Sequence, residues 1–261
     1  MSQTCQHVLF DRDGSRIAEM AGGSWNLKHG HVIRPHSHIE DQLLFASEGV
    51  MTLDTNQGVW VVPPLRAVWI PAETMHSVAM SGRVSMRTLY FSPGMCTSLP
   101  RECLVINISS LLRELILHAC TFPRLHQRVR RERHVIELVL DQLQIVQSIP
   151  VQLPQPRDPR AKRLVKKLLE DPADQRPLCE LAAECGAGKR TMQRLFTEET
   201  GMSFSEWRQR WRLVSAMQRL AAGESVTTVA LDVGYSSTSA FISMFRKHLG
   251  TTPTRYLAGI E

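Results

Sequence analysis

The C-terminal part of the chain contains an imperfect internal repeat, and no other feature of the sequence restricts the possible folds as strongly. Residues 178–207 form the first copy and residues 226–256 the second. The dipeptides Leu181-Ala182 and Val229-Ala230 match at an offset of 48, so the second copy has one additional residue in its turn. The pairs that match at an offset of 49 are Phe196 and Phe245, Gly201 and Gly250, Met192 and Phe241, and Trp207 and Tyr256.

Both copies have the pattern of two short helices joined by a turn. Apolar residues recur at i, i+3, i+4 and i+7, which places them on one helical face. Gly186 and Gly234 follow these patterns, where a left-handed helix end favours glycine. We therefore expect helix-turn-helix units at about 178–199 and 226–249, whose second helix enters the major groove of DNA. The apolar positions are Leu178, Leu181, Ala182, Cys185, Met192, Leu195 and Phe196 in the first copy, and Val226, Val229, Ala230, Val233, Phe241, Met244 and Phe245 in the second.

A generic helical bundle would show the same periodicity, so the outward residues decide between the two interpretations. In the first copy, the second helix has Lys189, Arg190, Gln193 and Arg194 on its outward face. Arginine pairs with guanine and glutamine with adenine, each through two hydrogen bonds in the major groove. A helix face that meets only solvent would more often mix Glu with Lys, so this face favours DNA recognition.

The repeat resembles the DNA-binding domain of the AraC/XylS family of bacterial transcription regulators. The resemblance covers residues 159–261 and implies two helix-turn-helix units on one long connecting helix, which read two adjacent segments of the major groove. It is carried by residues 190–196 (RTMQRLF), 199–201 (ETG), 233–237 (VGYSS), Phe241, 245–247 (FRK) and 250–253 (GTTP).

The resemblance also implies which residues contact DNA. The family often has arginine at the position of Ser243, so we expect the second unit to depend more on phosphate contacts and on Thr and Ser hydroxyls. By position, the residues that read bases are Arg190, Gln193 and Arg194 in the first unit and Thr238, Ser239, Ile242 and Ser243 in the second. The residues expected to contact phosphate are Lys189, Arg246 and Lys247.

The charge distribution agrees with a nucleic-acid partner. The chain has 261 residues and a formal net charge of +6. From Arg157 onward, 17 Lys and Arg stand against 12 Asp and Glu, a net charge of +5, whereas residues 1–156 carry 14 against 13. A basic C-terminal part fits a polyanionic partner, although many basic faces meet only solvent.

Other features of the sequence indicate a cytoplasmic protein without a membrane partner. The chain has no run of 18 or more apolar residues, and its N-terminus lacks the basic-then-apolar pattern of a signal peptide. The six cysteines form no CxxC pair and no disulfide framework. We therefore expect all six to be reduced thiols in a cytoplasm.

The N-terminal part carries short apolar or alternating segments separated by turn signals. This spacing predicts a small all-β barrel or sandwich, whereas residues 1–30 show little pattern. The expected turns include 47–49 (SEG) and 81–82 (SG). The expected strands are 43–46, 50–53, 59–62, 67–70, 76–80 and 84–91.

Two stretches inside this region resemble the sequence motifs of the cupin barrel. The first fits well, except that Gln42 replaces the usual Glu. The second has Glu73 where glycine is usual and lacks an Asn four residues after His76. The resemblance implies an α+β two-domain fold, with an N-terminal cupin-like β-barrel plus helices and an all-α C-terminal domain. The matching residues are Gly30, His36, His38, Gln42 and Gly49 in the first motif, and 71–76 (PAETMH) in the second.

His36, His38, Gln42 and His76 are the candidate residues of an effector pocket. His36 and His38 lie two apart on an expected strand and would point to the same face, and His76 would converge on them from a later strand. In metal-binding cupins the matching set is three His and one Glu. Three imidazoles suit Zn, Fe, Ni or Cu, but the loss of the carboxylate weakens the site. The alternative is that these residues hydrogen-bond an organic effector or each other, so we assign no metal or other cofactor.

Two apolar stripes, at 111–116 and 135–146, predict helices after the barrel. The family resemblance implies a homodimer through the helix at about 133–148, and the alternative is that this helix only packs on the barrel. Four prolines between Ile149 and Pro159 indicate an extended linker. The expected boundaries are 1–149 for the effector-sensing and dimerisation domain, 150–158 for the linker and 159–261 for the DNA-binding domain.

These features predict a sequence-specific transcription regulator, not an enzyme, whose activity a small ligand in the barrel modulates. Promoter DNA is the expected partner, with RNA polymerase as a second partner if the protein is an activator; the sign of regulation stays open. Two alternatives remain. One is a metal-dependent cupin enzyme fused to a DNA-binding domain, which needs a filled metal site. The other is a DNA-binding adaptor whose barrel only dimerises.

Overall fold

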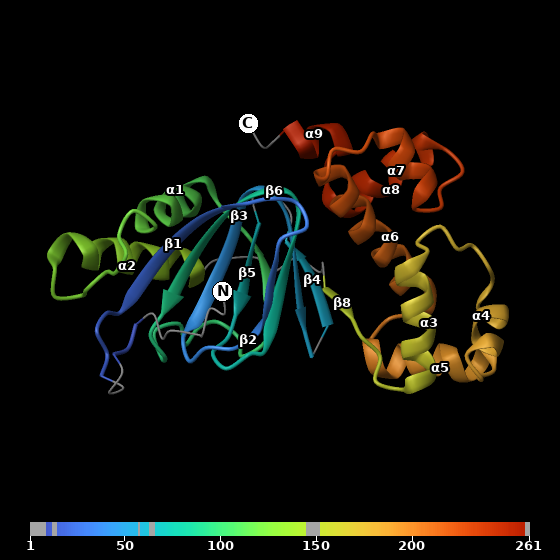
Figure 1. Cartoon of the computed structure of the whole chain (residues 1–261), viewed down its shortest axis with the longest axis horizontal. Coiled ribbons are helices and arrows are strands. Elements are labelled where there is room, and N and C mark those ends of the chain that lie inside the picture. Colours follow the sequence, from blue (N-terminus) through green and yellow to red (C-terminus); the bar gives the residue numbers. More distant parts are fainter. Residues whose placement is uncertain (1–8, 12–14, 57, 63–65, 145–151, 259–261) are drawn as a thin grey trace. The chain divides into compact units, whose positions relative to one another are not determined.

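Two long antiparallel strands, β3 (Asp41–Thr55) and β6 (His76–Phe91), form the centre of the N-terminal unit (Figure 1). The computed structural model describes residues 9–11, 15–56, 58–62, 66–144 and 152–258. The chain separates into two compact units, one of residues 1–56 and 60–152 and one of residues 57–59 and 153–261.

Shorter strands complete the sheet around β3 and β6. The first half of β3 pairs with β5, and its second half lies beside β4. The second half of β6 pairs with β1, and its first half pairs with β2. In the described residues the order of hydrogen-bonded strands does not return on itself, so the sheet is folded into two halves without closing into a ring. The remaining strands are β1 (Met20–Leu27), β2 (Val32–His36), β4 (Gly58–Val62), β5 (Arg66–Ile70) and β7 (Leu104–Asn107).

All six expected strand segments lie in strands, but two of the expected turns do not exist. Residues 47–49 lie inside β3 and residues 81–82 lie inside β6, so four expected strands are two. The β3–β6 register shifts on both sides of Glu48, which marks a β-bulge. Gly49 has a φ of 73°, and a methyl group there would lie 2.3 Å from the Arg83 carbonyl oxygen. Residues 47–49 and 81–82, which the sequence predicted as turns, therefore form the bend at which both strands pass from one half of the sheet to the other.

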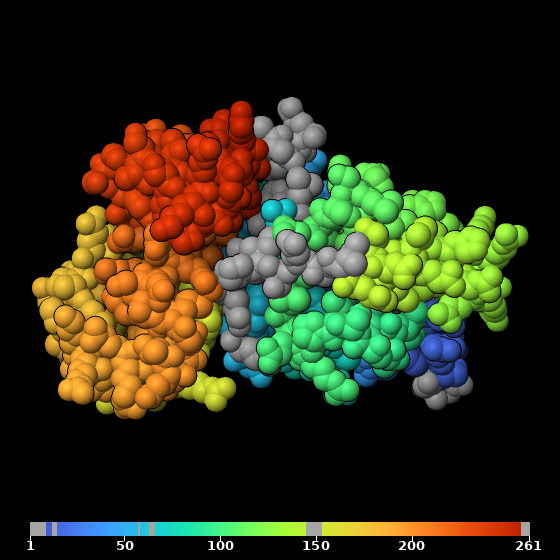
Figure 2. Space-filling model, turned by 180° about the vertical axis from the view of Figure 1, so that it is seen from behind, coloured from blue at the N-terminus to red at the C-terminus, as the bar shows by residue number. Residues whose placement is uncertain are grey.

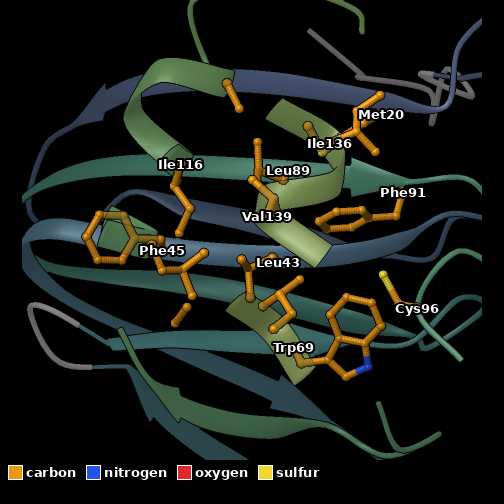
Figure 3. Packing of buried hydrophobic residues seen from close by; sticks show 14 of the residues in the cluster. Met20, Leu43, Phe45, Trp69, Leu89, Phe91, Cys96, Ile116, Ile136 and Val139 are labelled. Carbon is orange, nitrogen blue, oxygen red and sulfur yellow. The ribbon is translucent and has the colours of Figure 1, made fainter. Parts of the chain in front are cut away.

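The two faces of the folded sheet have separate cores because side chains alternate along a strand. Leu43 and Phe45 belong to a cluster that α1 (Ser110–Ala119) and α2 (Arg130–Gln144) cover, whereas Leu44 and Ala46 belong to the inner cluster. Figure 3 shows the helix-covered cluster, in which Ile116, Ile136 and Val139 meet the residues of the strands. The inner cluster includes Met51, Leu53, Trp60, Val62, Val68, Ile70, Val78, Met80, Val84 and Met86.

The C-terminal unit is helical. Its longest helix is α6, with one pair of short helices towards each of its ends (Figure 1). Ser203 and Glu206 form a capping box at the start of α6, and the side chain of Asp158 caps α3. A short strand, β8 (Gln152–Pro154), precedes α3. The helices are α3 (Pro159–Glu170), α4 (Leu178–Glu184), α5 (Lys189–Thr200), α6 (Phe204–Ala221), α7 (Val226–Asp232), α8 (Thr238–Leu249) and α9 (Pro253–Ala258).

The described residues also bear on three sequence predictions, which concern a membrane span, the cysteines and the proline-rich linker. None of the helices in the described part of the chain combines the length and the hydropathy that a membrane crossing requires. Five cysteines carry free thiols, and Cys5 lies outside the described residues, as does Pro150 of the linker. The free cysteines are Cys96, Cys103, Cys120, Cys179 and Cys185.

Candidate nucleic-acid interface and ligand pocket

Helix α5 separates the residues expected to read bases from those that hold the helix in place. Arg190, Gln193 and Arg194 are exposed. Met192 and Phe196 are fully buried on the opposite face, and Leu195 is 5% exposed. The helix is therefore fixed through its apolar face, and its two arginines and its glutamine point away from the core, where a DNA helix can reach them.

Arg194 is paired in the protein without DNA. Its Nη1 atom donates to Glu198 Oε2 at 2.8 Å, one helical turn further along α5, and both side chains are more than half exposed. An exposed pair of this kind contributes only about 0.3–0.5 kcal/mol to the stability of a helix. A guanine in the major groove can therefore replace Glu198 as the partner of Arg194 at small cost.

The turns before the two candidate recognition helices have the same geometry. Ala187 N donates to Ala182 O at 2.9 Å, and Tyr235 N donates to Ala230 O at 2.9 Å. Together with the adjacent shorter-range bonds, these are Schellman turns, which need a left-handed residue. Gly186 and Gly234 supply it, with φ values of 75° and 85°. The repeat predicted both glycines and their role.

Helix α8 offers a different surface from α5. Thr238 and Ile242 are half-buried and Ser239 and Ser243 are exposed, so its outward face starts with small and uncharged groups. The Ser237 side chain caps the helix by accepting from Ala240 N. The charged residues lie in the last turn, where Arg246 and Lys247 are exposed. This placement agrees with phosphate contacts at the end of α8.

An aromatic pair holds each of these helices against the unit. The rings of Phe196 and Trp207 lie 5.7 Å apart at 72°, and those of Phe245 and Tyr256 lie 5.4 Å apart at 79°. These four residues match in the repeat, so the sequence symmetry is also a packing symmetry. Trp207 is fully buried, and its Nε1 donates to Pro154 O at 2.8 Å.

In the N-terminal unit, three histidines lie close together. The ring centroids of His36 and His76 are 4.3 Å apart, those of His38 and His76 are 5.3 Å apart, and those of His36 and His38 are 5.9 Å apart. The predicted convergence is correct, but one part of its reasoning is wrong. His36 is the last residue of β2 and His38 lies beyond it, so the two do not share a face of one strand.

Each ring is oriented by its own backbone. The Nδ1 atom of His36 lies 2.9 Å from Arg34 O, and that of His76 lies 2.8 Å from Thr74 O. The Nδ1 atom of His38 lies 2.8 Å from Glu40 O. A carbonyl oxygen only accepts, so each Nδ1 carries the hydrogen, and the neutral ring keeps a lone pair on Nε2. Burial lowers the pKa of His76 to about 4, so this ring is neutral near pH 7.

Gln42 joins the histidines to two residues that the sequence motifs did not indicate. Its Oε1 lies 3.1 Å from His38 Nε2. Its Nε2 donates to Thr88 Oγ1 at 2.9 Å and to Tyr90 Oη at 3.2 Å. Thr88 and Tyr90 alternate with Leu89 and Phe91, which belong to the helix-covered core, so the period of β6 was the available signal.

Comparison with known proteins gives matches to both units. A model of an AraC-like ligand-binding domain matches residues 26–187. A model of a helix-turn-helix domain matches residues 181–259.

Several curated and solved proteins are similar to the chain. It is 35% identical over 223 residues to the HTH-type transcriptional regulator NimR of Escherichia coli strain K12. The aligned region covers 85% of this chain and 81% of NimR. The chain is 43% identical over 107 residues to the HTH-type transcriptional regulator RipA of Corynebacterium glutamicum. This aligned region covers 41% of this chain and 32% of RipA. A crystal structure of unsaturated fatty acid bound ToxT from Vibrio cholerae is 13% identical and covers 93% of this chain and 97% of that one, with a TM-score of 0.38.

Proposed function

The chain belongs to the AraC family of transcription regulators, and from this membership we propose that α5 and α8 recognise a specific promoter sequence. It has an N-terminal ligand-binding domain and a C-terminal helix-turn-helix DNA-binding domain. In the proposal, residues 1–149 are the sensing domain, residues 150–158 the linker and residues 159–261 the DNA-binding domain.

One observation supports this assignment above the others. Arg190, Gln193 and Arg194 form an exposed row on α5, and the buried residues behind them fix the row in place. Arginine and glutamine are the side chains that make two-pronged contacts with guanine and adenine. Arg190, Gln193 and Arg194 read bases in the first unit.

The second unit divides its contacts differently. Thr238, Ser239, Ile242 and Ser243 face the bases with hydroxyl and methyl groups, which suit the thymine methyl and tolerate several bases. Lys189, Arg246 and Lys247 contact phosphate and set the register of the protein on the duplex. Specificity is therefore stronger in the half of the site that α5 occupies.

Selection from a random duplex library tests this assignment. We expect the full chain to enrich one motif, with two elements about 10 base pairs apart because two adjacent major-groove segments are read. A variant with Arg190→Ala, Gln193→Ala and Arg194→Ala should lose one element and retain the other. A matched control, Arg113→Ala with Glu114→Ala on α1, should enrich the full motif. Selection of the same motif by the triple variant would contradict the assignment.

The N-terminal unit is the sensor. His36, His38, Gln42 and His76, together with Thr88 and Tyr90, hold the ligand that modulates DNA binding. Their inward polar atoms among apolar core residues are the feature expected of a ligand site. A ligand that prefers one state of the chain shifts the population that binds DNA.

A homodimer is the third part of the proposal. Val135, Val139 and Leu143 of α2 are buried in the core of their own unit, so the interface uses the outer side of the helix, where Leu138 is 46% exposed. The helix segment expected at 133–148 is described only to Gln144. Figure 2 shows the side chains of α1 and α2 (green to yellow-green) on one face of this unit. RNA polymerase is a partner if the protein activates transcription.

A further inference from the structure

We propose that the three-histidine cluster of the N-terminal unit is a binding site for a divalent transition-metal ion, held by the Nε2 atoms of His36, His38 and His76 and by Oε1 of Gln42. The proposal deepens the proposed function and rests on it in one respect, because it names the ligand of the same sensing pocket. It concerns binding and does not involve a chemical reaction.

The first support is the convergence of the donor atoms. One ring nitrogen from each histidine lies within 4.8 Å of the other two, and among the described residues no other group of His, Cys, Asp or Glu side chains does this. Nitrogen ligands about 2.0 Å from a tetrahedral ion lie roughly 3.3 Å from one another. The three nitrogens must therefore approach one another by at most about 1.5 Å for a tetrahedral ion to bind all three.

The second support is the direction of the lone pairs. All three histidines donate Nδ1–H to a backbone carbonyl oxygen, at 2.8 to 2.9 Å. In metal sites the ligating histidine donates its other ring N–H to a carbonyl or carboxylate, which fixes the tautomer and raises the basicity of the ligand. The three carbonyl groups, of Arg34, Glu40 and Thr74, thus prepare three Nε2 atoms as ligands in advance.

The third support is a contact between two acceptors. His38 Nε2 and Gln42 Oε1 lie 3.1 Å apart, and the hydrogen on His38 is already used at Nδ1. The amide cannot simply be turned round, because its Nε2 donates to Thr88 and the Thr88 hydroxyl donates to Leu43 O. A cation between the two atoms satisfies both. A proton on His38 Nε2 would also satisfy this contact, so the contact supports a bound cation only together with the convergence of the three rings.

The donor set indicates which ions fit. Three imidazoles and an amide oxygen suit Zn²⁺, Ni²⁺, Cu²⁺ or Fe²⁺ better than Mg²⁺ or Ca²⁺, which prefer oxygen ligands alone. The set contains no carboxylate, so the bound ion keeps its full charge. His38 and His76 are buried, whereas His36 is only half-buried, so the ion enters past His36.

Calorimetric titration of the full-length chain, purified without a histidine tag and freed of metal by a chelator, tests the proposal. The probe is Zn²⁺ alone, with Ni²⁺ as a second ion and Mg²⁺ as the negative control. We expect about one Zn²⁺ per chain. His36→Ala should weaken binding about tenfold or more, since loss even of a group that supports a ligand has an effect of that size. His31→Ala, an exposed histidine outside the cluster, should bind as the unchanged chain does.

Gln42→Glu distinguishes coordination from a purely structural role. It adds the negative ligand that the site lacks, so Zn²⁺ should bind about tenfold or more tightly, and thermal stability should rise more on adding Zn²⁺ than in the unchanged chain. Absence of stoichiometric Zn²⁺ binding, or equal affinities for the unchanged chain, His36→Ala and Gln42→Glu, would overturn the proposal. Binding of a small primary ammonium ion by the cluster, without binding of any metal, would also overturn the proposal.

DNA binding by the same preparations separates this proposal from the proposed function. If selected DNA is bound and Zn²⁺ is not, the metal site fails and the regulator remains. If Zn²⁺ is bound with one ion per chain and no DNA sequence is preferred, the metal site stands and the assignment of α5 and α8 fails.

Discussion

Arg194 and Glu198 form an ion pair on the exposed face of α5, with 2.8 Å between Arg194 Nη1 and Glu198 Oε2. The residue that we expect to read a guanine is thus held by a carboxylate until DNA arrives. The same carboxylate would face the phosphates of bound DNA. In the proposed complex we therefore expect Glu198 to weaken DNA binding in general, whereas the choice of base would come from the contacts of Arg194.

Glu198→Gln should raise affinity for DNA of any sequence. Removal of one negative charge near phosphate is worth about 1 kcal/mol, close to fivefold in the dissociation constant at low salt. The stability of the fold should change by less than about 0.5 kcal/mol, since the pair is exposed. Glu114→Gln on α1 is the control, because it removes the same charge from another exposed ion pair, with Arg113, outside the proposed DNA and dimer surfaces. Fluorescence anisotropy at low salt measures the DNA affinity of both variants. Equal affinities of the two variants would contradict a position of Glu198 near DNA.

Arg246→Ala should weaken binding to selected and random DNA by the same factor. A phosphate contact releases counterions, so its loss should also reduce the slope of log affinity against log salt by about 1. Arg246→Lys retains the charge and should retain the slope. Titrations at several salt concentrations decide the matter, and a loss restricted to one base position would show that Arg246 reads sequence instead.

The two turn glycines should differ in their tolerance of alanine. Gly186→Ala and Gly234→Ala both place a side chain at a positive φ, which costs about 1–2 kcal/mol. At Gly186 the nearest atom to the new methyl group is 3.9 Å away. At Gly234 the methyl group would lie 2.8 Å from Arg212 Nη2, which donates to Asp174 O at 3.0 Å.

Gly234→Ala should therefore lower the free energy of unfolding by roughly 1 kcal/mol more than Gly186→Ala does, because Arg212 must lose a hydrogen bond or the turn must shift. Urea unfolding of the full chain compares the two variants. An equal loss would show that Arg212 moves aside without consequence.

Leu138→Glu should disrupt the homodimer without unfolding the chain. The side chain is 46% exposed on the outer side of α2, so a charge there is tolerated in the monomer but not in an apolar interface. Leu111→Glu on α1, 53% exposed, is the control for a charge on a neighbouring exposed leucine. Sedimentation should show a monomer for Leu138→Glu only. If both variants and the unchanged chain sediment alike, the outer side of α2 is not the interface.

The helical unit could be predicted from the sequence because its signals are local. The repeat places Phe196 and Phe245 at equivalent positions, and both are fully buried. The glycines of the turns have the positive φ values that their positions require. In such a unit, each helix is specified by its own periodicity and its own end.

The sheet was harder to predict because its signals depend on distant contacts. Gly49 indicated a turn, yet it lies in a bulge whose shape depends on the approach of Arg83. The glycine-rich β1 showed no strand pattern. A methyl group at Gly22 would lie 2.6 Å from the Ala119 carbonyl oxygen, so a helix 97 residues further along explains a glycine that the local sequence does not. The histidine cluster was found through its motifs, whereas Thr88 and Tyr90 follow from the alternation of β6, which is usable only when that strand is known to run unbroken from His76 to Phe91.

The most direct test of sequence reading by α5 is methylation interference at guanine N7 on a selected site. Arginine contacts N7 and O6 of guanine in the major groove, so methylation of one guanine should prevent binding of the unchanged chain. Arg194→Ala should bind that site about 1–3 kcal/mol more weakly and should no longer respond to methylation of that guanine. The same interference pattern for both proteins, with equal loss of affinity for selected and random DNA, would contradict base reading by Arg194.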